Sequence, residues 1–324
     1  MLRGLTALVL TLLGMSAAWA QASVQAWPSK QPIRVVVPIA AGSGTDLTAR
    51  LVFEQVSNQI GQAIVVENRV GAGGIIGTNA VAKAEPDGYT ILMTPSSHTV
   101  TPAAVANLPF DTIKDFSAVI PLVNVPNVLV VAPDKGYKSA QDFAAAAKAR
   151  SEGVNYASTG AGNASHLNAE RFRLAAGFEA VHVPYGGAPQ ALTEVMTGRV
   201  DFYFSPLSPA LPFLRDGKLQ ALAVAGKTRS SALPNVPTTT EAGFSNSEYE
   251  FWFGAFVPSA TPRAIVQRLH EEIAKALAHP AVRTRLTNLG ADPMPMTPAE
   301  FDAFLQKEVA ENIELVKAAG IKVN

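Results

Sequence analysis

The chain has 324 residues, with 26 basic and 26 acidic side chains and 48% hydrophobic residues. This balance excludes nucleic acid as the main partner, because nucleic-acid binding requires a basic surface. The absence of cysteine excludes disulfides, thiol catalysis and cysteine-ligated metal sites. The length and the ordinary share of apolar residues predict a globular protein with one large domain or two smaller ones.

Residues 1–20 have the pattern of a cleavable secretory signal peptide. Arg3 is their only charged residue, Leu5 to Leu13 form a short apolar core, and Ala18-Trp19-Ala20 is a small-x-small cleavage signal. An uncleaved N-terminal anchor is the alternative, but such an anchor needs roughly 20 apolar residues without a cleavage site. We therefore expect a soluble, exported protein, with a disordered tail over residues 21–29.

Runs of β-forming residues alternate with helical patterns. Continuous apolar runs of this kind are typical of strands buried on both faces of a parallel sheet. In the first part of the chain we expect strands at 33–38, 63–67 and 89–94, and helices at 47–60 and 77–84. From residue 127 we expect strands at 127–132, 154–158, 180–184, 200–204 and 219–225, and helices at 139–149, 165–176 and 189–197.

The pattern changes after Gly226. Residues 229–243 are rich in Pro, Thr and Ser and predict an extended connection. A strand-like run at 250–257 and three helical patterns follow. In the helical pattern at 262–278, apolar residues fall four apart and predict one buried face. The expected surface for these helices is the first sheet.

Strand–helix alternation predicts the α/β class. We interpret the chain as two lobes, each a mostly parallel sheet flanked by helices. Lobe one is residues 28–125 together with 226–324, and lobe two is residues 126–225, inserted into lobe one. The two chain crossings near residues 125 and 226 would form a hinge.

A strand, a glycine-rich loop and a helix follow one another four times. The loops are Pro38 to Asp46, Arg69 to Gly74, Ser158 to Asn163 and Pro184 to Ala188. Glycine lets backbone amides approach a ligand, and the first N–H groups of the following helix are free and partly positive. Each loop is either an anion site at the carboxyl end of a strand or only a tight connection. Four such loops, two in each lobe, favour a binding cleft.

Nucleotide-binding and catalytic motifs do not account for these loops. Gly226-Lys227-Thr228 lacks the upstream glycine of a phosphate loop, and Ile76 occupies the sixth position of the nearest dinucleotide pattern. The five histidines form no H-E-x-x-H pair, and there is no G-x-S-x-G elbow. We therefore expect a protein that is not an enzyme and that carries no metal or cofactor.

Three side chains near the loops allow two interpretations each. Asp46 either caps the following helix, with Arg50 one turn away, or contacts the ligand. His166 either faces the cleft or bonds to backbone or water. Phe204 either lines the cleft or belongs to the core. Ser205 directly follows a strand, and we expect it to reach the cleft.

A series of sequence runs is informative through its order and spacing. The runs are PIAAGSGTDLTAR at 38–50, ENRVGAGGIIGTNAVAKAEPDGYT at 67–90, LPFDTIKDFSAV at 108–119, YASTGAGNASHLNAE at 156–170, VPYGGAPQALTEVMTGRVDFYF at 183–204, GKLQALAVAGKTRSSALPNVPTTTEAGF at 217–244, TPRAIVQRLHEEIAKAL at 261–277, TPAEF at 297–301 and AGIKV at 319–323. In these runs the chain resembles the Bug-type periplasmic solute receptors of tripartite tricarboxylate transporters. The resemblance covers essentially the whole mature chain, from Pro32 to Val323.

The resemblance implies a two-lobed periplasmic binding protein of type II, a Venus flytrap. It would close as a monomer on a small organic carboxylate and deliver it to the membrane permease subunits of the transporter. In this family, backbone amides and waters of the first two glycine loops hold one carboxylate, and the second lobe adds two further loops. With the strand-end side chains included, the expected ligand-binding residues are Ala41, Ser43, Gly44, Thr45, Asp46, Gly73, Gly74, Ser96, Thr159, Gly160, Gly162, Asn163, Ser165, His166, Tyr185, Gly186, Gly187, Phe204 and Ser205.

Two positions depart from the family pattern. Gly186 stands where Lys or Arg often follows the Tyr of the V-P-Y loop, and Asn163 stands where Ser is common. A cation that would pair with a second carboxylate is missing, which predicts a monocarboxylate or a solute whose far end is neutral or aromatic. The alternative functions are a ligand-sensing receptor for a membrane signalling protein and an exported α/β enzyme acting on carboxylates.

Overall fold

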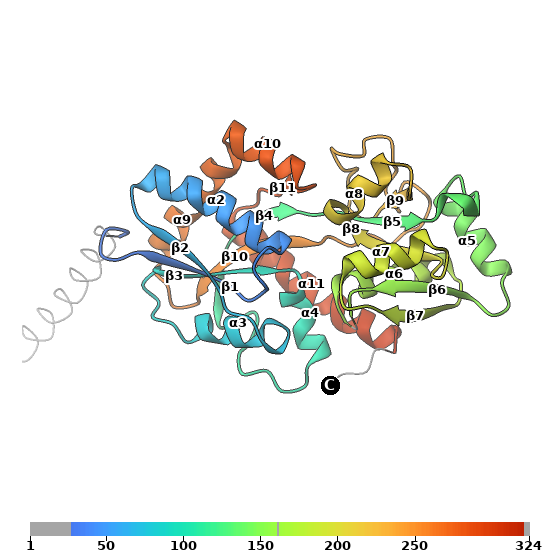
Figure 1. The fold of residues 1–324 in the computed structure, drawn as a ribbon. Helices are drawn as coiled ribbons and strands as arrows, with labels where there is room; N and C mark the ends of the chain where they lie inside the picture. Colours follow the sequence, from blue (N-terminus) through green and yellow to red (C-terminus); the bar gives the residue numbers. More distant parts are fainter. Residues whose placement is uncertain (1–26, 161, 321–324) are drawn as a thin grey trace, which may run out of the picture.

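Two β-sheets with flanking helices make up the described part of the chain (Figure 1). The computed structural model describes residues 27–160 and 162–320. The signal peptide expected over residues 1–20, and most of the tail expected over 21–29, lie outside the described residues. None of the described helices is long and apolar enough to cross a membrane.

The first sheet is mixed and takes its strands from both ends of the chain. Its order is β11-β4-β10-β3-β1-β2. Strands β2, β1 and β3 are parallel, whereas β10 is antiparallel to both of its neighbours, β3 and β4. The bounds are β1 Ile33–Val37, β2 Ile64–Asn68, β3 Thr90–Pro95, β4 Phe116–Asn124, β10 Trp252–Pro258 and β11 Asp292–Pro293.

Helices cover both faces of the first sheet. Val35 and Val37 of β1 share a core with α2 (Gly44–Ile60) and α9 (Arg263–Ala278). Val36 points to the opposite face and packs with residues of α3 (Ile75–Ala82) and α11 (Pro298–Ala318). Because successive side chains of a strand point to opposite faces and both faces are covered at this end of β1, Val35, Val36 and Val37 are all buried, whereas Arg34 is exposed. The buried face predicted for α9 is confirmed by Ile265, Leu269, Ile273 and Leu277.

The second sheet is also mixed, in the order β7-β6-β8-β5-β9. Strands β7, β6 and β8 are parallel, and β5 is antiparallel to β8 and β9. Aromatic rings fill the core under α5 and α6, and a separate aliphatic cluster lies under α7 and α8. The bounds are β5 Asn127–Val131, β6 Val154–Ser158, β7 Ala180–Pro184, β8 Phe202–Pro206, β9 Gln220–Val224, α5 Ala140–Ala149, α6 Ala164–Ala176, α7 Ala188–Met196 and α8 Leu207–Arg215.

The α/β class is confirmed, but strand β4 and helix α4 (Ser97–Ala104), like the two-residue β11, were not expected from the sequence. Strand β4 contains Pro121, which removes a backbone donor and makes a central strand hard to predict. Its partner β10 shows a register shift between Phe253 and Gly254, where Gly254 pairs with Pro121. Helix α4 contains Pro102. In both cases tertiary packing overrides a residue that disfavours the element.

The chain passes directly from the first sheet to the second between Asn124 and Asn127. The connection from β9 back to β10 lies against the second sheet, because Thr239 N–H donates to Val224 O and Tyr249 N–H donates to Ala225 O, at 2.8 and 2.7 Å. The lobe boundaries predicted above remain a prediction. In the same connection, Ser231 Oγ donates to Asp292 Oδ1 of β11 at 2.6 Å, so the connection contacts both sheets.

Helix α11 joins the two cores. Phe301 and Leu305 near its start pack in the first-sheet cluster of Val36, whereas Leu315 and Val316 near its end pack with the aromatic core of the second sheet. A capping box between Thr297 and Glu300 fixes its start. Figure 1 shows this helix running beneath the junction of the two sheets.

Glu308 lies at the centre of this junction and is only 9% exposed. Trp252 Nε1–H donates to Glu308 Oε2 at 3.0 Å. Thr99 Oγ1 lies 2.7 Å from Glu308 Oε2 and 2.8 Å from Ser96 O, and it accepts from Asn312 Nδ2 at 3.2 Å. The single hydroxyl proton of Thr99 can serve only one oxygen, so a protonated Glu308 that donates to Thr99 satisfies every group. Burial correspondingly raises the pKa of Glu308 to about 8.

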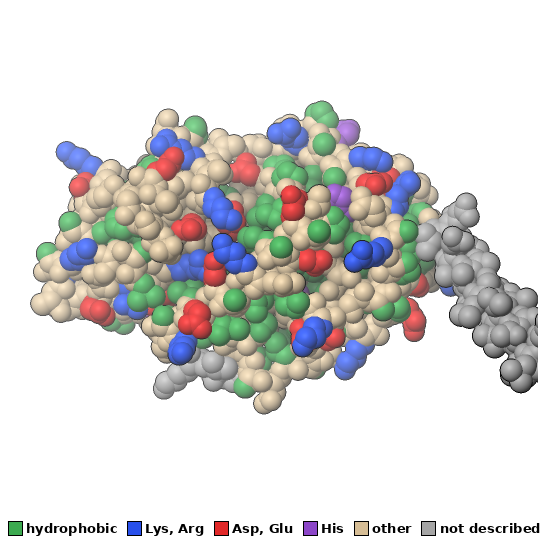
Figure 2. All heavy atoms as spheres, turned by 180° about the vertical axis from the view of Figure 1, so that it is seen from behind, with side chains coloured by type: hydrophobic (Ala, Val, Ile, Leu, Met, Phe, Trp, Pro, Cys, Tyr) green, Lys and Arg blue, Asp and Glu red, His purple; other side chains and the backbone are tan. Residues whose placement is uncertain are grey.

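Charges of both signs are interspersed on the face of the molecule seen in Figure 2. Blue and red side chains lie next to one another between apolar patches, in keeping with the equal numbers of basic and acidic residues. A polyanion such as nucleic acid binds to a surface that is mainly positive, and this face has no such excess of positive charge.

We predict that Glu308→Gln removes a pH-dependent loss of stability. The carboxyl has a higher pKa in the folded protein than in the unfolded chain, so unfolding releases a proton between about pH 4.5 and pH 8 and wild-type stability falls as the pH rises. The variant should match wild type near pH 5 and exceed it at pH 8, by an amount on the order of several kcal/mol. Urea unfolding across this range measures the difference, with Glu314→Gln on the exposed side of α11 as the control. Parallel stability curves for wild type and Glu308→Gln would contradict the assignment.

Candidate ligand site

The first glycine loop leads from β1 into α2. Ser43 is the N-cap, and its Oγ accepts the Asp46 N–H at 3.3 Å. Within residues 27–160 and 162–320, the Gly44 and Thr45 amides have no hydrogen-bond acceptor. They are the free donors expected at a helix start, where the partial positive charge of the helix also lies. Ala41 and Gly44 are exposed and Ser43 is partly exposed.

The carboxylate of Asp46 holds the first loop together. Its Oδ2 accepts the Gly42 N–H at 2.8 Å, and its Oδ1 accepts Asn68 Nδ2 at 2.9 Å and pairs with Arg50 Nη2 at 3.0 Å. Burial raises the pKa of Asp46, but the hydrogen bonds from Arg50, Gly42 and Asn68 outweigh burial and leave it below its usual range. The carboxylate therefore holds the loop before α2, and Ser43 rather than Asp46 is the N-cap. A contact between Asp46 and the ligand stays a prediction.

The second glycine loop follows β2 and packs against the first. It contains a short 3₁₀ helix, η1 (Ala72–Gly74), in which Gly73 and Gly74 adopt φ of 65° and 99°. A Cβ on Gly77 would lie 2.5 Å from the Arg69 carbonyl oxygen and 2.9 Å from Pro38 Cβ. Glycine at this position lets α3 approach the loop after β1 closely. Gly73 is exposed and Gly74 is buried.

The ends of β1, β2 and β3 converge on a small cavity of about 10 Å³. Ile39 after β1, Gly74 after β2 and His98 after β3 all line it. A space of this size holds about one water molecule. The three parallel strands therefore bring their loops to one edge of the first sheet, as their direction requires.

The loop after β6 is held by its own side chains. Asn163, the N-cap of α6, accepts the His166 N–H at 3.1 Å and the Ser165 hydroxyl at 2.8 Å through Oδ1. Asn163 Nδ2 donates to Thr159 Oγ1 at 2.6 Å, and Gly162 N–H donates to His166 Nδ1 at 2.9 Å. Ser165 and His166 are buried, whereas the loop backbone is partly exposed at Thr159, Gly160, Gly162 and Asn163.

The loop after β7 lies beside the loop after β6. Tyr185 N–H donates to Ser158 O at 2.9 Å, and Gly186 N–H donates to Gln190 Oε1 at 3.1 Å. Gly187 is the N-cap of α7. The nearest atom to a Cβ on Gly186 would be the flexible Gln190 Oε1 at 3.3 Å, so this position has room for a side chain.

The loop-bearing edges of the two sheets meet at the junction. A Cβ on Gly162 would lie 3.8 Å from Ala104 Cβ, at the end of α4. Ser208, which follows β8, donates a hydrogen bond to the Leu289 carbonyl, which precedes β11. Figure 1 shows the N-terminal end of α2 directed toward the second sheet. The free amides of α2 and the loops after β6 and β7 therefore belong to facing edges.

Three expected ligand residues have fully buried side chains. Ser96 is fully buried at the start of α4, Phe204 packs on Phe172 in the second core, and Ser205 Oγ donates to Pro206 O at 2.9 Å. Thr45 is buried as well. Helices cover both faces of each sheet, so side chains on either face of a strand end are buried. Residue type alone therefore does not show which of these side chains contacts a ligand.

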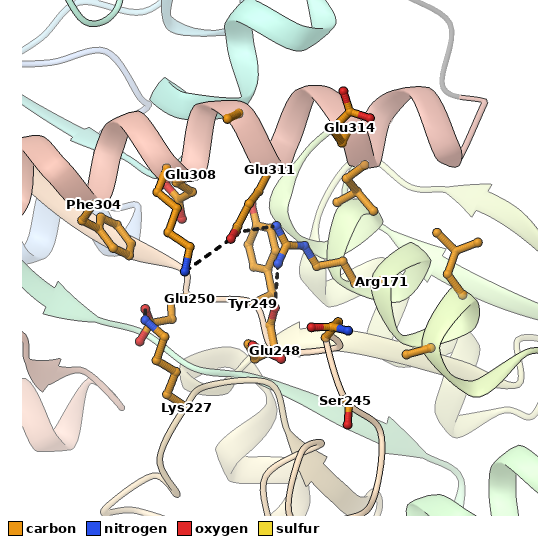
Figure 3. Close-up of a pocket in the computed structure, with 16 residues that line it drawn as sticks. Arg171, Lys227, Ser245, Glu248, Tyr249, Glu250, Phe304, Glu308, Glu311 and Glu314 are labelled. Carbon is orange, nitrogen blue, oxygen red and sulfur yellow. Dashed lines mark hydrogen bonds and ion pairs between the residues drawn. The ribbon is translucent and has the colours of Figure 1, made fainter.

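A larger cavity of about 640 Å³ lies elsewhere, between α6, α11 and residues 245–250 (Figure 3). Its charged side chains pair with one another: Arg171 lies 3.6 Å from Glu311, and Lys227 lies 2.8 Å from Glu250. Lys307 is the third basic residue of the lining, Glu248 and Glu314 add further carboxylates, and Glu308 adds a carboxyl that burial keeps protonated. Carboxylates therefore still outnumber basic side chains here, which disfavours an anionic ligand, so we place the candidate site at the glycine loops.

Sequence analysis did not single out Glu308 or the contact between His166 and His182. The two imidazole rings are stacked, with centroids 3.9 Å apart and planes 8° apart. His182 lies on β7 and His166 on α6, sixteen positions apart, so only the fold brings them together. No local sequence signal marks such a pair.

The comparisons with known proteins identify the family. The family model described as the tripartite tricarboxylate transporter family receptor matches residues 48–321. The chain belongs to this family. BugT of Bordetella pertussis is 33% identical over 309 residues, which are 94% of this chain and 94% of BugT. Members of this receptor family bind solutes and are not enzymes.

Solved structures of similar receptors share the fold. The periplasmic binding protein BugD is 31% identical, with a TM-score of 0.75 over 90% of this chain and 99% of BugD. MatC of Rhodopseudomonas palustris with bound malate is 32% identical, with a TM-score of 0.74 over 89% and 99% of the two chains. Rpa4515 of R. palustris with adipate is 32% identical, with a TM-score of 0.78 over 91% and 99%. The receptor therefore has the two-lobed periplasmic binding protein fold.

We predict that Gly77→Ala disrupts the first-sheet site while Gly186→Ala does not. The new methyl group at residue 77 would overlap backbone atoms, whereas at residue 186 it meets only a flexible side chain. Overpacking of this kind costs roughly 1–3 kcal/mol, which urea denaturation measures. Equal stability losses in the two variants would contradict the packing argument.

Proposed function

We propose that this receptor captures a small carboxylate-bearing solute between its two lobes and delivers it to the permease of a tripartite tricarboxylate-type transporter. In this proposal the protein is exported with cleavage after Ala20 and acts in the periplasm as a monomer. The observation that carries the proposal is the pair of free amides at Gly44 and Thr45, at the start of a 17-residue helix whose N-terminus faces the second sheet.

The electrostatics of this helix start favour a carboxylate as the bound group. Free N–H donors and the positive end of the helix dipole bind anions without a basic side chain. The nearby negative charge of Asp46 is countered by Arg50 and by donors from Asn68 and Gly42. The malate and adipate bound by the two R. palustris receptors are carboxylates, which supports this ligand class.

The second sheet would close over the rest of the solute. The loops after β6 and β7 present polar groups of Thr159, Asn163 and Tyr185 and the amide backbone of Gly187. None of these side chains carries a formal positive charge. The far end of the solute would therefore be recognised by hydrogen bonds and contact with Tyr185.

We predict that residues 21–324 are stabilised by carboxylates. A ligand at about 100 times its Kd adds roughly 2.7 kcal/mol to the free energy of unfolding. Thermal denaturation with mono-, di- and tricarboxylates, including aromatic acids, should show a rise in Tm for one chemical class. The matched control is the primary amide of each active acid, which keeps the shape and removes the charge. A rise with the amide equal to that with the acid, or no rise with any acid after removal of bound solute by denaturation and refolding, would refute carboxylate recognition.

We predict that Gly186→Lys shifts selectivity toward dicarboxylates. The position is exposed and accommodates a side chain, so a lysine ammonium can reach a second carboxylate on the solute. Calorimetric Kd values for a monocarboxylate and the dicarboxylate of the same length measure the ratio. Gly186→Gln controls for side-chain size without charge. An unchanged ratio in Gly186→Lys would exclude this position as a selectivity determinant.

Delivery to a permease is tested in cells. Deletion of the receptor gene should abolish uptake of the radiolabelled solute found in the binding panel, and the wild-type gene should restore it. If uptake persists in the deletion strain, the protein binds the solute but does not have the proposed role in its transport.

A further inference from the structure

Three helices of this protein begin with the same arrangement. In α2 and α5 an aspartate three residues after the N-cap accepts the backbone N–H of the residue before the cap. Asp46 accepts from Gly42 at 2.8 Å, and Asp142 accepts from Lys138 at 3.0 Å. In α6 the same position is His166, whose Nδ1 accepts the Gly162 N–H at 2.9 Å. An imidazole thus replaces a carboxylate as the group that holds the loop before the helix.

We propose that His166 is a positioning residue for the solute-binding loop before α6, and that protonation of the stacked His166 and His182 releases this loop in acid. The proposal rests on the proposed function only in treating this loop as part of the solute site. His166 acts through Gly162 and is not assigned a contact with the solute.

The hydrogen bond to Gly162 requires neutral His166. An imidazole that accepts at Nδ1 carries its proton on Nε2, whereas an imidazolium has two N–H donors and no acceptor. Protonation therefore leaves the Gly162 N–H without its partner. The hydrogen bonds from Arg50, Gly42 and Asn68 hold the pKa of Asp46 below its usual range, so acid that protonates His166 opens the start of α6 before that of α2.

The stacked ring of His182 adds to this sensitivity. Its Nε2 lies 2.5 Å from Ser158 Oγ, which also accepts the Gly160 N–H at 3.0 Å. The two rings lie 3.9 Å apart, so two imidazolium charges would repel each other directly. The pair is therefore tied to the loop at two points, through Gly162 and through Ser158.

The groups around the rings do not supply a free counter-charge. Glu170 on α6 accepts the Tyr156 hydroxyl from β6 at 2.6 Å and is paired with Arg173 at 2.8 Å. Glu179, before β7, is 91% exposed and lies 3.8 Å from Arg173. Ala319 and Gly320 at the end of α11 complete the surroundings. Burial, reinforced by the charge of His182, lowers the pKa of His166 to about 4, and burial lowers the pKa of His182. The charge of Glu170 raises the pKa of both imidazoles, but burial outweighs it.

The first test needs no solute. In two-dimensional NMR of the full mature chain, the Gly162 amide resonance should move with the same midpoint as the His166 ring, below pH 5.5, and should not move in His166→Asn. Asparagine places an acceptor where Nδ1 lies and does not titrate. His279→Asn, at an exposed position, should leave the Gly162 titration unchanged. The proposal would be overturned if the Gly162 chemical shift does not change as His166 titrates, or if it still changes with pH in His166→Asn.

The second test measures binding of adipate and malate, with each Kd expressed for the fully ionised acid. For whichever acid binds wild type, His166→Phe should weaken binding at pH 7 about fivefold to tenfold, the effect of one lost hydrogen bond. His166→Asn should keep the pH 7 affinity and lose the fall in affinity that wild type shows in acid. Wild-type affinity in His166→Phe would overturn the positioning role. If neither acid binds wild type, these two dicarboxylates are not its solutes, and the NMR titration decides by itself whether His166 holds the loop.

Discussion

The Asp46 carboxylate is the contact on which the first-sheet site depends. It joins the loop after β1, the end of β2 and the first turn of α2, through Gly42, Asn68 and Arg50. With Gly42 and Asn68 bound to it, the chain before α2 is fixed and the Gly44 and Thr45 amides are left pointing out of the helix start. An anion site can then be built from backbone alone, because its donors need no side-chain entropy to be ordered.

The loop before α6 in the second sheet is also fixed by side-chain hydrogen bonds, but from different residues. Asn163 replaces Ser43 as the N-cap, His166 replaces Asp46, and the loop is further tied by Thr159 and Ser165. The first-sheet loop therefore depends on an ion pair with Arg50, and the second-sheet loop depends on neutral hydrogen bonds. The two halves of the site should respond differently to salt and to acid, since salt screens exposed ion pairs and acid titrates imidazole.

The elements around the site follow from the sequence more directly than the roles of its side chains. Strand, glycine loop and helix patterns predict β1, α2, β6 and α6, because apolar runs and caps are local signals. Helix α2, however, begins at Gly44, three residues before the start expected from the sequence. Ser96 and Phe204 are buried because of what covers their sheets, and that depends on helices far away in sequence. Glu308 meets Trp252 and Thr99 only after α11 has packed across the junction, so no local pattern marks it. Side-chain roles at this site are therefore set by long-range contacts.

The place of β10 in the first sheet bears on how the chain folds. Strand β10 lies between β3 and β4, yet it follows them by more than a hundred residues and comes after every strand of the second sheet. The second sheet uses a continuous stretch of chain, so its strands can pair as soon as residue 224 is available. Until residues 252–258 arrive, β3 and β4 have unpaired edges that can pair wrongly. The order of the strands thus makes the first sheet the last to complete its pairing. During synthesis, the unpaired edges of β3 and β4 would stay exposed to aggregation until β10 is made.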